Sequence, residues 1–235
     1  MTRGAVGKTS TDAGSAAAPA TARRAGLDRD DVVDAALALV EAEGSSALTM
    51  RRLAGELGVT TTTIYWHVGG RDELVTALIR RLSERLAGRP VVGDTPAERV
   101  HSAAVNIWDS ARAHRHVTAL AHQVGAVSLL ELPLEVALVR ELEAAGLRGV
   151  AVRDAQRAIV MCTAGFLVVA LRSGAPVRAD LRHAALWAGV DTTGISAETL
   201  AALGRSPSLP SLFEATLRSV IAGLLPPAED ETDDR

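Results

Sequence analysis

The sequence is poor in cysteine and aromatic residues and has no excess of positive charge. Cys162 is the one cysteine among 235 residues, so no intramolecular disulfide can form, which is typical of a reducing cytoplasm. Cys162 stands within an apolar stretch, where core packing is the simpler role. The formal net charge is −3 at pH 7, so any nucleic-acid site has to be a local basic patch.

Long uninterrupted apolar runs are also missing. The longest, Ala158 to Leu171, lies between two arginines and spans about 14 residues, fewer than the ~20 that cross a membrane. No apolar core follows Arg3 and Lys8, so a secretory signal is not expected. The sequence therefore predicts a cytoplasmic protein with no membrane partner.

The chemistry of an enzyme or cofactor site is equally hard to find. The sequence has no paired nucleophile and base, no metal-ligand spacing and no glycine-rich cofactor loop. Gly7-Lys8-Thr9 resembles the end of a phosphate-binding loop, but Thr2 replaces the required earlier glycine. His114 and His116 would point to different faces of a helix and do not form a metal site. We expect neither an enzyme nor a bound cofactor or metal.

Apolar residues make up 48% of the chain, and leucine, alanine, valine and arginine dominate, a mixture that favours helices over sheet. Periodicity and turn residues divide the chain into four parts. We expect a disordered tail over 1–25, a first helical domain over 26–86, a second over 95–226 and an acidic tail over 227–235. Two roles remain open for this N-terminal tail: its basic residues contact DNA phosphates, or the tail is only a solvated leader.

Helix start and stop signals alternate between 27 and 86. Polar caps that follow an apolar residue begin three helices, and glycines end them. The caps are Asp28, Thr49 and Thr60, and the glycines are Gly44, Gly58, Gly69 and Gly70. A fourth helix is predicted over 72–86. The two short helices between 49 and 68, with a glycine-containing turn between them, form a helix-turn-helix pattern.

The second short helix has a composition that does not suit a buried helix. Four successive threonines, 60–63, are followed by Ile64-Tyr65-Trp66-His67. Four hydroxyls would need partners in a core, whereas phosphate oxygens and base edges supply them on a helix that faces DNA. Three arginines against one glutamate give the stretch 49–71 a local charge of +2. The composition indicates a DNA-binding helix.

Four segments then occur in order at characteristic spacings. They are Ala47-Leu48-Thr49-Met50-Arg51-Arg52-Leu53-Ala54, Leu57-Gly58-Val59, Ile64-Tyr65-Trp66-His67-Val68 and Arg71-Asp72-Glu73-Leu74. Together they resemble the DNA-binding domain of the tetracycline-repressor (TetR) family, over residues 27–86. The resemblance implies an all-α fold, with an N-terminal three-helix helix-turn-helix DNA-binding domain and a C-terminal helical ligand-binding and dimerisation domain. Beyond residue 86 the chain matches only in length and helical character.

The resemblance also implies DNA contacts position by position. The implied DNA-binding residues are Thr49, Arg51, Thr61, Thr62, Thr63, Tyr65, His67 and Arg71. Ile64 and Trp66 are expected to pack inward. Three other readings stay open: Thr49 as a plain helix cap, His67 as a structural residue and Arg52 as part of a solvated face.

Apolar helices also fill the second half of the sequence. We expect them over 95–113, 114–124, 134–144, 152–171, 178–188, 198–203 and 209–225. The helix over 152–171 is almost wholly apolar and should be buried on most sides. Together with the last helix it is expected to form a homodimer that presents two recognition helices to successive major grooves. The interface candidates are Phe166, Val169, Leu212, Leu217, Val220 and Ile221.

A ligand pocket is expected between these helices. Candidate lining residues are Trp108, His116, His122, Gln123, Cys162 and Trp187, although ordinary packing or surface placement explains each one singly. Apolar helix faces with few charged clusters indicate a small, largely apolar effector. The sequence thus predicts a repressor that binds a palindromic double-stranded DNA operator as a homodimer and is released by that effector. Two alternatives remain open, an activator of the same fold and a helical-bundle enzyme or binding protein without a DNA role.

Overall fold

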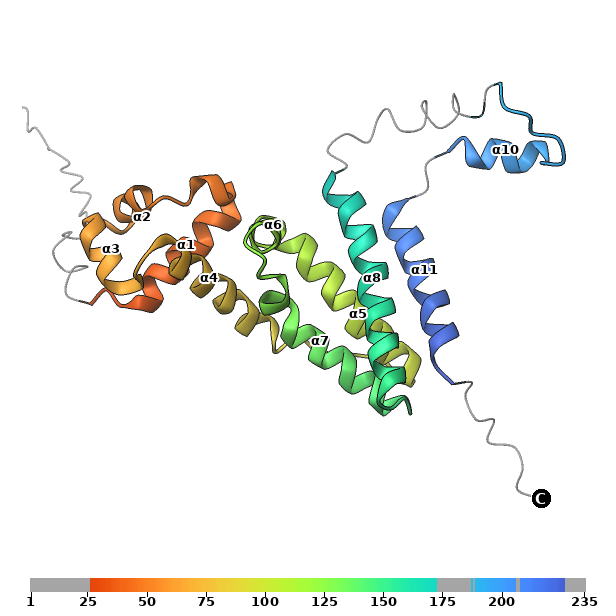
Figure 1. The fold of residues 1–235 in the computed structure, drawn as a ribbon, viewed down its shortest axis with the longest axis horizontal. Helices are drawn as coiled ribbons and strands as arrows, with labels where there is room; N and C mark the ends of the chain where they lie inside the picture. Colours follow the sequence, from red (N-terminus) through yellow and green to blue (C-terminus); the bar gives the residue numbers. More distant parts are fainter. Residues whose placement is uncertain (1–25, 173–186, 188, 206–207, 227–235) are drawn as a thin grey trace, which may run out of the picture.

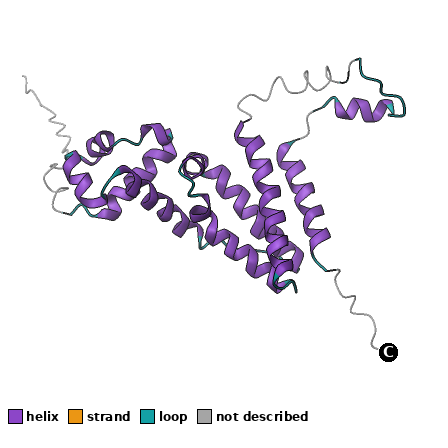
Figure 2. Ribbon diagram, viewed as in Figure 1, coloured by secondary structure: helices purple, strands orange, loops and turns teal. Residues whose placement is uncertain are grey.

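The structure, a computed structural model, describes residues 26–172, 187, 189–205 and 208–226. These residues form α-helices and one 3₁₀ turn, and none of them lies in a strand (Figure 1, Figure 2). The expected all-α fold is therefore confirmed. The described residues exclude the tails expected over 1–25 and 227–235. They also exclude the helix expected over 178–188, apart from Trp187.

Four helices and the 3₁₀ turn make up the N-terminal domain. They are α1 (Arg29–Glu43), η2 (Ser45–Ala47), α2 (Met50–Leu57), α3 (Thr61–Val68) and α4 (Arg71–Leu86). The predicted caps are present, because Asp28 forms a capping box with Asp31 and the hydroxyls of Thr49 and Thr60 accept backbone N–H groups of the next turn. Gly58 takes the left-handed conformation (φ 67°) that ends α2 and begins the turn.

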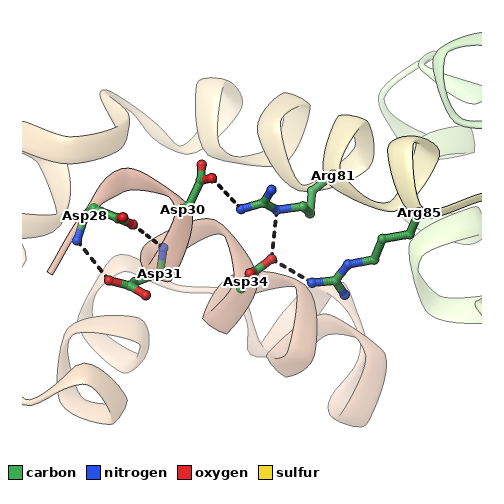
Figure 3. A network of polar contacts seen from close by, with 6 residues as sticks. All are labelled: Asp28, Asp30, Asp31, Asp34, Arg81 and Arg85. Carbon is green, nitrogen blue, oxygen red and sulfur yellow. Dashed lines mark hydrogen bonds and ion pairs between the residues drawn. The ribbon is translucent and has the colours of Figure 1, made fainter.

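Ion pairs fasten α4 to the first half of α1 (Figure 3). Arg81 of α4 contacts Asp30 at 2.8 Å and Asp34 at 2.9 Å, and Arg85 contacts Asp34 at 2.8 Å. A hydrogen bond with Asp30, assisted by the charges of both carboxylates, raises the pKa of Arg81 above its ordinary value. Since the two arginines lie one helical turn apart, these contacts set the rotation of α4 against α1.

Five helices pack into the C-terminal domain. They are α5 (Pro96–Ala113), α6 (Arg115–Gln123), α7 (Val127–Ala144), α8 (Val150–Arg172) and α11 (Leu209–Leu224). Because α7 packs against both α5 and α4, a continuous apolar core joins the two domains. α6 also packs against α1, which gives the junction a second contact.

α7 begins at Val127 rather than at Leu134, so the expected start of this helix is wrong. Pro133 lies inside the helix, in the part that the prediction left out. A proline removes one backbone hydrogen bond, and here Leu130 and Leu134 are both 3% exposed in the core on either side of it. Burial of these side chains outweighs the local loss.

α8 is buried along one stripe, so the expected burial on most sides is wrong for a single chain. Its buried residues include Val152, Ala155, Ile159, Thr163 and Leu167. Met161 is 70% exposed and Val168 is 53% exposed. α11 behaves in the same way, since Leu217 is fully buried whereas Leu212 is 42% exposed. The remaining candidates divide similarly, with Ile221 buried, Phe166 and Val220 half-buried and Val169 exposed.

The short helix α10 (Ala197–Leu203) buries none of its residues and is drawn away from the C-terminal domain in Figure 1. It corresponds to the helix expected over 198–203. Among the described residues, no single helix is long and apolar enough to span a membrane. By length and composition alone the pair α6 and α7 would pass together, with a bend of 120° between them.

Candidate nucleic-acid interface

α3 is held in the N-terminal domain by two buried side chains. Ile64 is fully buried and Val68 is 4% exposed, and they lie one helical turn apart. Thr61 and Thr62 in the first turn of the helix, and Tyr65 further along it, are exposed to solvent. This geometry leaves hydroxyl groups, methyl groups and a phenol free to contact base edges and phosphates.

Trp66 is 81% exposed, so its expected inward packing is wrong, whereas the inward packing of Ile64 is confirmed. Trp66 is two residues from Ile64 and two from Val68, which places it about 200° around the helix from each. The spacing alone could therefore have predicted its exposure. Its indole ring lies edge-on to the imidazole of His67, with ring centroids 4.8 Å apart. Trp66 thus extends the exposed surface formed by Thr61, Thr62 and Tyr65.

The remaining residues of the implied DNA surface divide between capping and exposure. Thr63 is half-buried, and its hydroxyl lies 3.0 Å from that of Thr60, the cap of α3. Thr49 is exposed while its hydroxyl caps α2, so a cap role does not hide it from DNA. His67 is half-buried near the end of α3. Arg71 is exposed in the first turn of α4.

Two adjacent arginines at the start of α2 have different surroundings. Arg52 forms ion pairs with Glu43 of α1 and with Glu56, whose Oε1 lies 3.5 Å from its Nε. Arg51 is exposed, and it forms no ion pair with any residue in the described part of the chain. Arg51 therefore keeps its charge available for a polyanion, whereas the charge of Arg52 is already compensated.

The structure does not bring the six candidate ligand residues together. Trp108 is buried at 3% exposure among Phe166 and Phe213, and Cys162 is half-buried on α8. His116 and Gln123 face the N-terminal domain, where they contact Glu41 and Ser45. His122 and Trp187 are exposed. Burial raises the pKa of the Cys162 thiol, which disfavours the reactive thiolate.

Two cavities in the described structure lie away from these six residues. The larger, of about 820 Å³, runs between α1 and α4 and is lined mainly by charged side chains. The smaller, of about 160 Å³, lies between α5 and α11 beside His101 and Arg218. His101 Nε2 lies 3.0 Å from a carboxylate oxygen of Glu214, which also pairs with Arg218.

A carboxyl group that the sequence did not single out occupies the C-terminal domain. Burial, and after it the charge of Glu135, raises the pKa of Glu131 from its ordinary 4.5 to about 7. Glu135 lies one turn further along α7 and accepts a hydrogen bond of 2.7 Å from Gln156 of α8. Only the folded structure reveals this desolvation, because the sequence shows an ordinary i, i+4 acidic pair.

Comparisons with known proteins show which chains this one resembles in sequence and in fold. The sequence profile of the bacterial regulatory proteins of the tetR family matches residues 32–78. Tetracycline repressor protein class D from Escherichia coli is 46% identical over 52 residues, which cover 22% of this chain and 24% of that protein. The transcriptional repressor DrrR1 from Streptomyces coeruleorubidus is 38% identical over 68 residues, 29% of this chain and 25% of that protein. The chain therefore matches about a quarter of the length of these relatives.

A solved structure extends the similarity beyond this segment. The Streptomyces coelicolor TetR family protein ActR, in complex with (S)-DNPA, has a TM-score of 0.61 and 25% sequence identity. The match covers 85% of this chain and 98% of that one. The similarity in fold thus includes the C-terminal helices, where the sequence resemblance was weakest.

The first prediction compares the two arginines of α2. Arg51→Ala should weaken DNA binding by about 1–3 kcal/mol and, where the contact is to phosphate, lower the salt slope by about 0.9. Arg52→Ala is the matched control and should change the binding free energy by less than about 0.5 kcal/mol, because Glu43 and Glu56 already hold its charge. Fluorescence anisotropy at several salt concentrations measures both. Equal losses in the two variants would contradict the assignment.

The second prediction concerns pH. Since the folded state raises the pKa of Glu131 above 4.5, this group contributes stability below pH 4.5 that is lost as pH rises through about 7. The effect of Glu131→Gln is the free energy of unfolding of the variant minus that of the wild type. This difference should be more favourable to the variant at pH 8 than at pH 5, by about 1–2 kcal/mol after allowance for partial solvation. Urea unfolding at both pH values measures the difference. The exposed Glu143→Gln serves as control, and an equal pH dependence in both variants would refute the desolvation of Glu131.

Proposed function

We propose that the chain is a transcription repressor of the tetR family rather than an enzyme, because residues 32–78 match the sequence profile of that family and resemble tetracycline repressors. It binds a palindromic double-stranded DNA operator as a homodimer. A small, largely apolar molecule binds the C-terminal domain and releases the operator. The single observation that carries the proposal is the exposure of Thr61, Thr62 and Tyr65 on α3, a helix that is held in place by the buried Ile64 and Val68.

The proposed DNA surface combines two kinds of contact. Thr61 and Thr62, in the first turn of α3, are suited to base edges, because their hydroxyls form hydrogen bonds and their methyls fit the thymine methyl. Thr49, Tyr65 and Arg71 are suited to phosphate oxygens, which position the domain without selecting a sequence. Arg51 adds charge at the side of α2, and the remaining members, Thr63 and His67, border the surface.

The exposed faces of α8 and α11 support the homodimer. On α8 the exposed residues follow one another at helical spacing: Ala158, Met161, Gly165 and Val168. On α11 they are Leu212, Ala215, Ser219 and Ala222. α8 and α11 pack against each other, and we infer that the two stripes, which contain several small residues, together form the face that a second copy covers. A second copy would cover this face around a two-fold axis and form a four-helix interface.

The third prediction tests this face. Met161→Glu should convert the dimer to monomers, because a second copy would bury the new carboxylate, whereas a monomer leaves this position 70% exposed. Sedimentation at micromolar concentration measures the change, and circular dichroism should remain helical. Ser128→Glu, at an exposed position on α7, is the control and should stay dimeric. A Met161→Glu protein that sediments as a dimer would contradict the proposed interface.

Aromatic side chains in the C-terminal domain support a largely apolar effector. The ring of Trp108 stacks on Phe213 with centroids 4.3 Å apart, and Phe166 meets both rings edge-on. The guanidinium of Arg112 lies 5.3 Å from the centre of the Trp108 ring. Such a cluster gives the interior of this domain the aromatic and apolar character that suits a largely apolar ligand. The similar fold of ActR in complex with (S)-DNPA is consistent with a small-molecule effector.

Selection of bound fragments from genomic DNA tests the proposed function. The dimer should enrich fragments that share a short palindrome whose half-sites are about one helical turn apart, ~34–36 Å. Recovery of fragments with no shared sequence would refute a sequence-specific regulator. The genes beside the enriched sites then indicate which compounds to titrate as effectors.

The fourth prediction concerns release. A ligand that dissociates the operator must bind the DNA-free state more tightly, so operator DNA must weaken its binding by the same factor. Calorimetric titration of each compound into the protein, with and without operator duplex, measures both affinities. Equal affinity under the two conditions would refute release by that compound, however tightly it bound.

A further inference from the structure

One backbone carbonyl group in the last turn of α1 receives its hydrogen bond from the C-terminal domain. The final carbonyl groups of a helix have no partners within the helix, and the last turn of α1 contains no basic residue. The Gly44 N–H bonds the carbonyl of Val40 at 2.8 Å. The carbonyl of Glu41 instead accepts from Nδ1 of His116, on α6, at 2.9 Å. α6 thus caps α1 from another domain.

A second histidine binds the side chain of the same residue. His114, at the corner between α5 and α6, lies with its Nδ1 2.6 Å from the carboxylate Oε1 of Glu41. A carbonyl and a carboxylate only accept, so both imidazole rings carry hydrogen on Nδ1 and donate it to Glu41. Side-chain exposure is 28% for His114 and 35% for Glu41, so the contact is partly shielded from water. At the other end of α6, Ser45 and Gln123 make a long contact of 3.4 Å.

We propose that His114 and His116 are positioning residues that fix the angle of the DNA-binding domain on the C-terminal domain, and thereby the distance between the two recognition helices of the dimer. This inference rests on the proposed function. α1 packs directly against α3, so a tilt of α1 moves α3 with it. Arg81 and Arg85 hold the first half of α1 to α4, and the two histidines hold its last turn to α6.

The consequence for DNA binding is a requirement on spacing. Two recognition helices held at a fixed distance match half-sites about one DNA turn apart and tolerate little change in the intervening base pairs. Loss of the two histidine contacts weakens the attachment of α1 to α6, so that α1 tilts more easily about its attachment to α4. Each DNA-binding domain then still binds its half-site. The two domains of the dimer also adapt more easily to half-sites that are separated by one base pair more or fewer.

The test uses the full-length dimer and the palindromic operator recovered from genomic DNA. Affinity is measured for the operator, for duplexes with one base pair added or removed between the half-sites, and for a single half-site. The ratio of native-spaced to altered-spaced affinity should fall roughly three- to tenfold in a His114→Ala/His116→Ala double variant. Its affinity for the single half-site should be unchanged. His122→Ala, at an exposed position on the same helix, should discriminate as the wild type does.

Each outcome is decisive. A double variant that discriminates spacing as sharply as the wild type overturns the inference, and so does an equal loss of affinity for every duplex, which would indicate a damaged domain rather than a freed one. Failure of the wild type to recover any operator would refute the proposed function itself. The selection from genomic DNA reveals that failure before any variant is measured, so the two kinds of failure are distinguished.

Discussion

The packing of Ile64 and Val68 in the core of the N-terminal domain holds α3 in place and determines which of its side chains are exposed to DNA. An eight-residue helix is not stable alone in water, so packing against other helices has to hold it. Ile64 and Val68 provide that packing, and because they lie one turn apart they also fix the rotation of the helix. The same rotation turns Thr62, Tyr65 and Trp66 outward, and Thr61 is exposed as the first residue of the helix. The side chains available for DNA are therefore decided by two apolar residues.

α1 connects this helix to the remainder of the molecule. One face packs on α3, the first half is paired with Arg81 and Arg85 of α4, and the last turn is bound by His114 and His116. α4 and α6 both contact α7, so the two attachments of α1 lead into the same C-terminal core. A molecule that shifts the helices of this core can change the position of α3 without contacting the DNA surface. An effector that acts at a distance requires this kind of coupling.

Local chemistry made much of the fold predictable. Caps such as Asp28 and Thr95 act on the next turn of their own helix, so the sequence alone locates the helix starts. Packing between distant segments was not predictable in this way. Pro133 lies inside α7 because its neighbours are buried, and α8 exposes one side because a single chain covers only the other. His116, a candidate ligand residue in sequence, contacts Glu41 at a separation of 75 residues, which no local pattern reveals.

The most direct test of the account is a comparison of the base preferences of the wild type with those of Thr61→Ala and Thr62→Ala, each measured by the same selection from genomic DNA. Both residues are exposed, so their replacement should leave the fold intact. Ser46→Ala, at an exposed position of η2, is the control and should keep the wild-type preference. The account predicts changed preference at one or two base pairs of each half-site, about 1–3 kcal/mol per lost contact, with the other positions retained. Preferences identical to the wild type in both variants would contradict it.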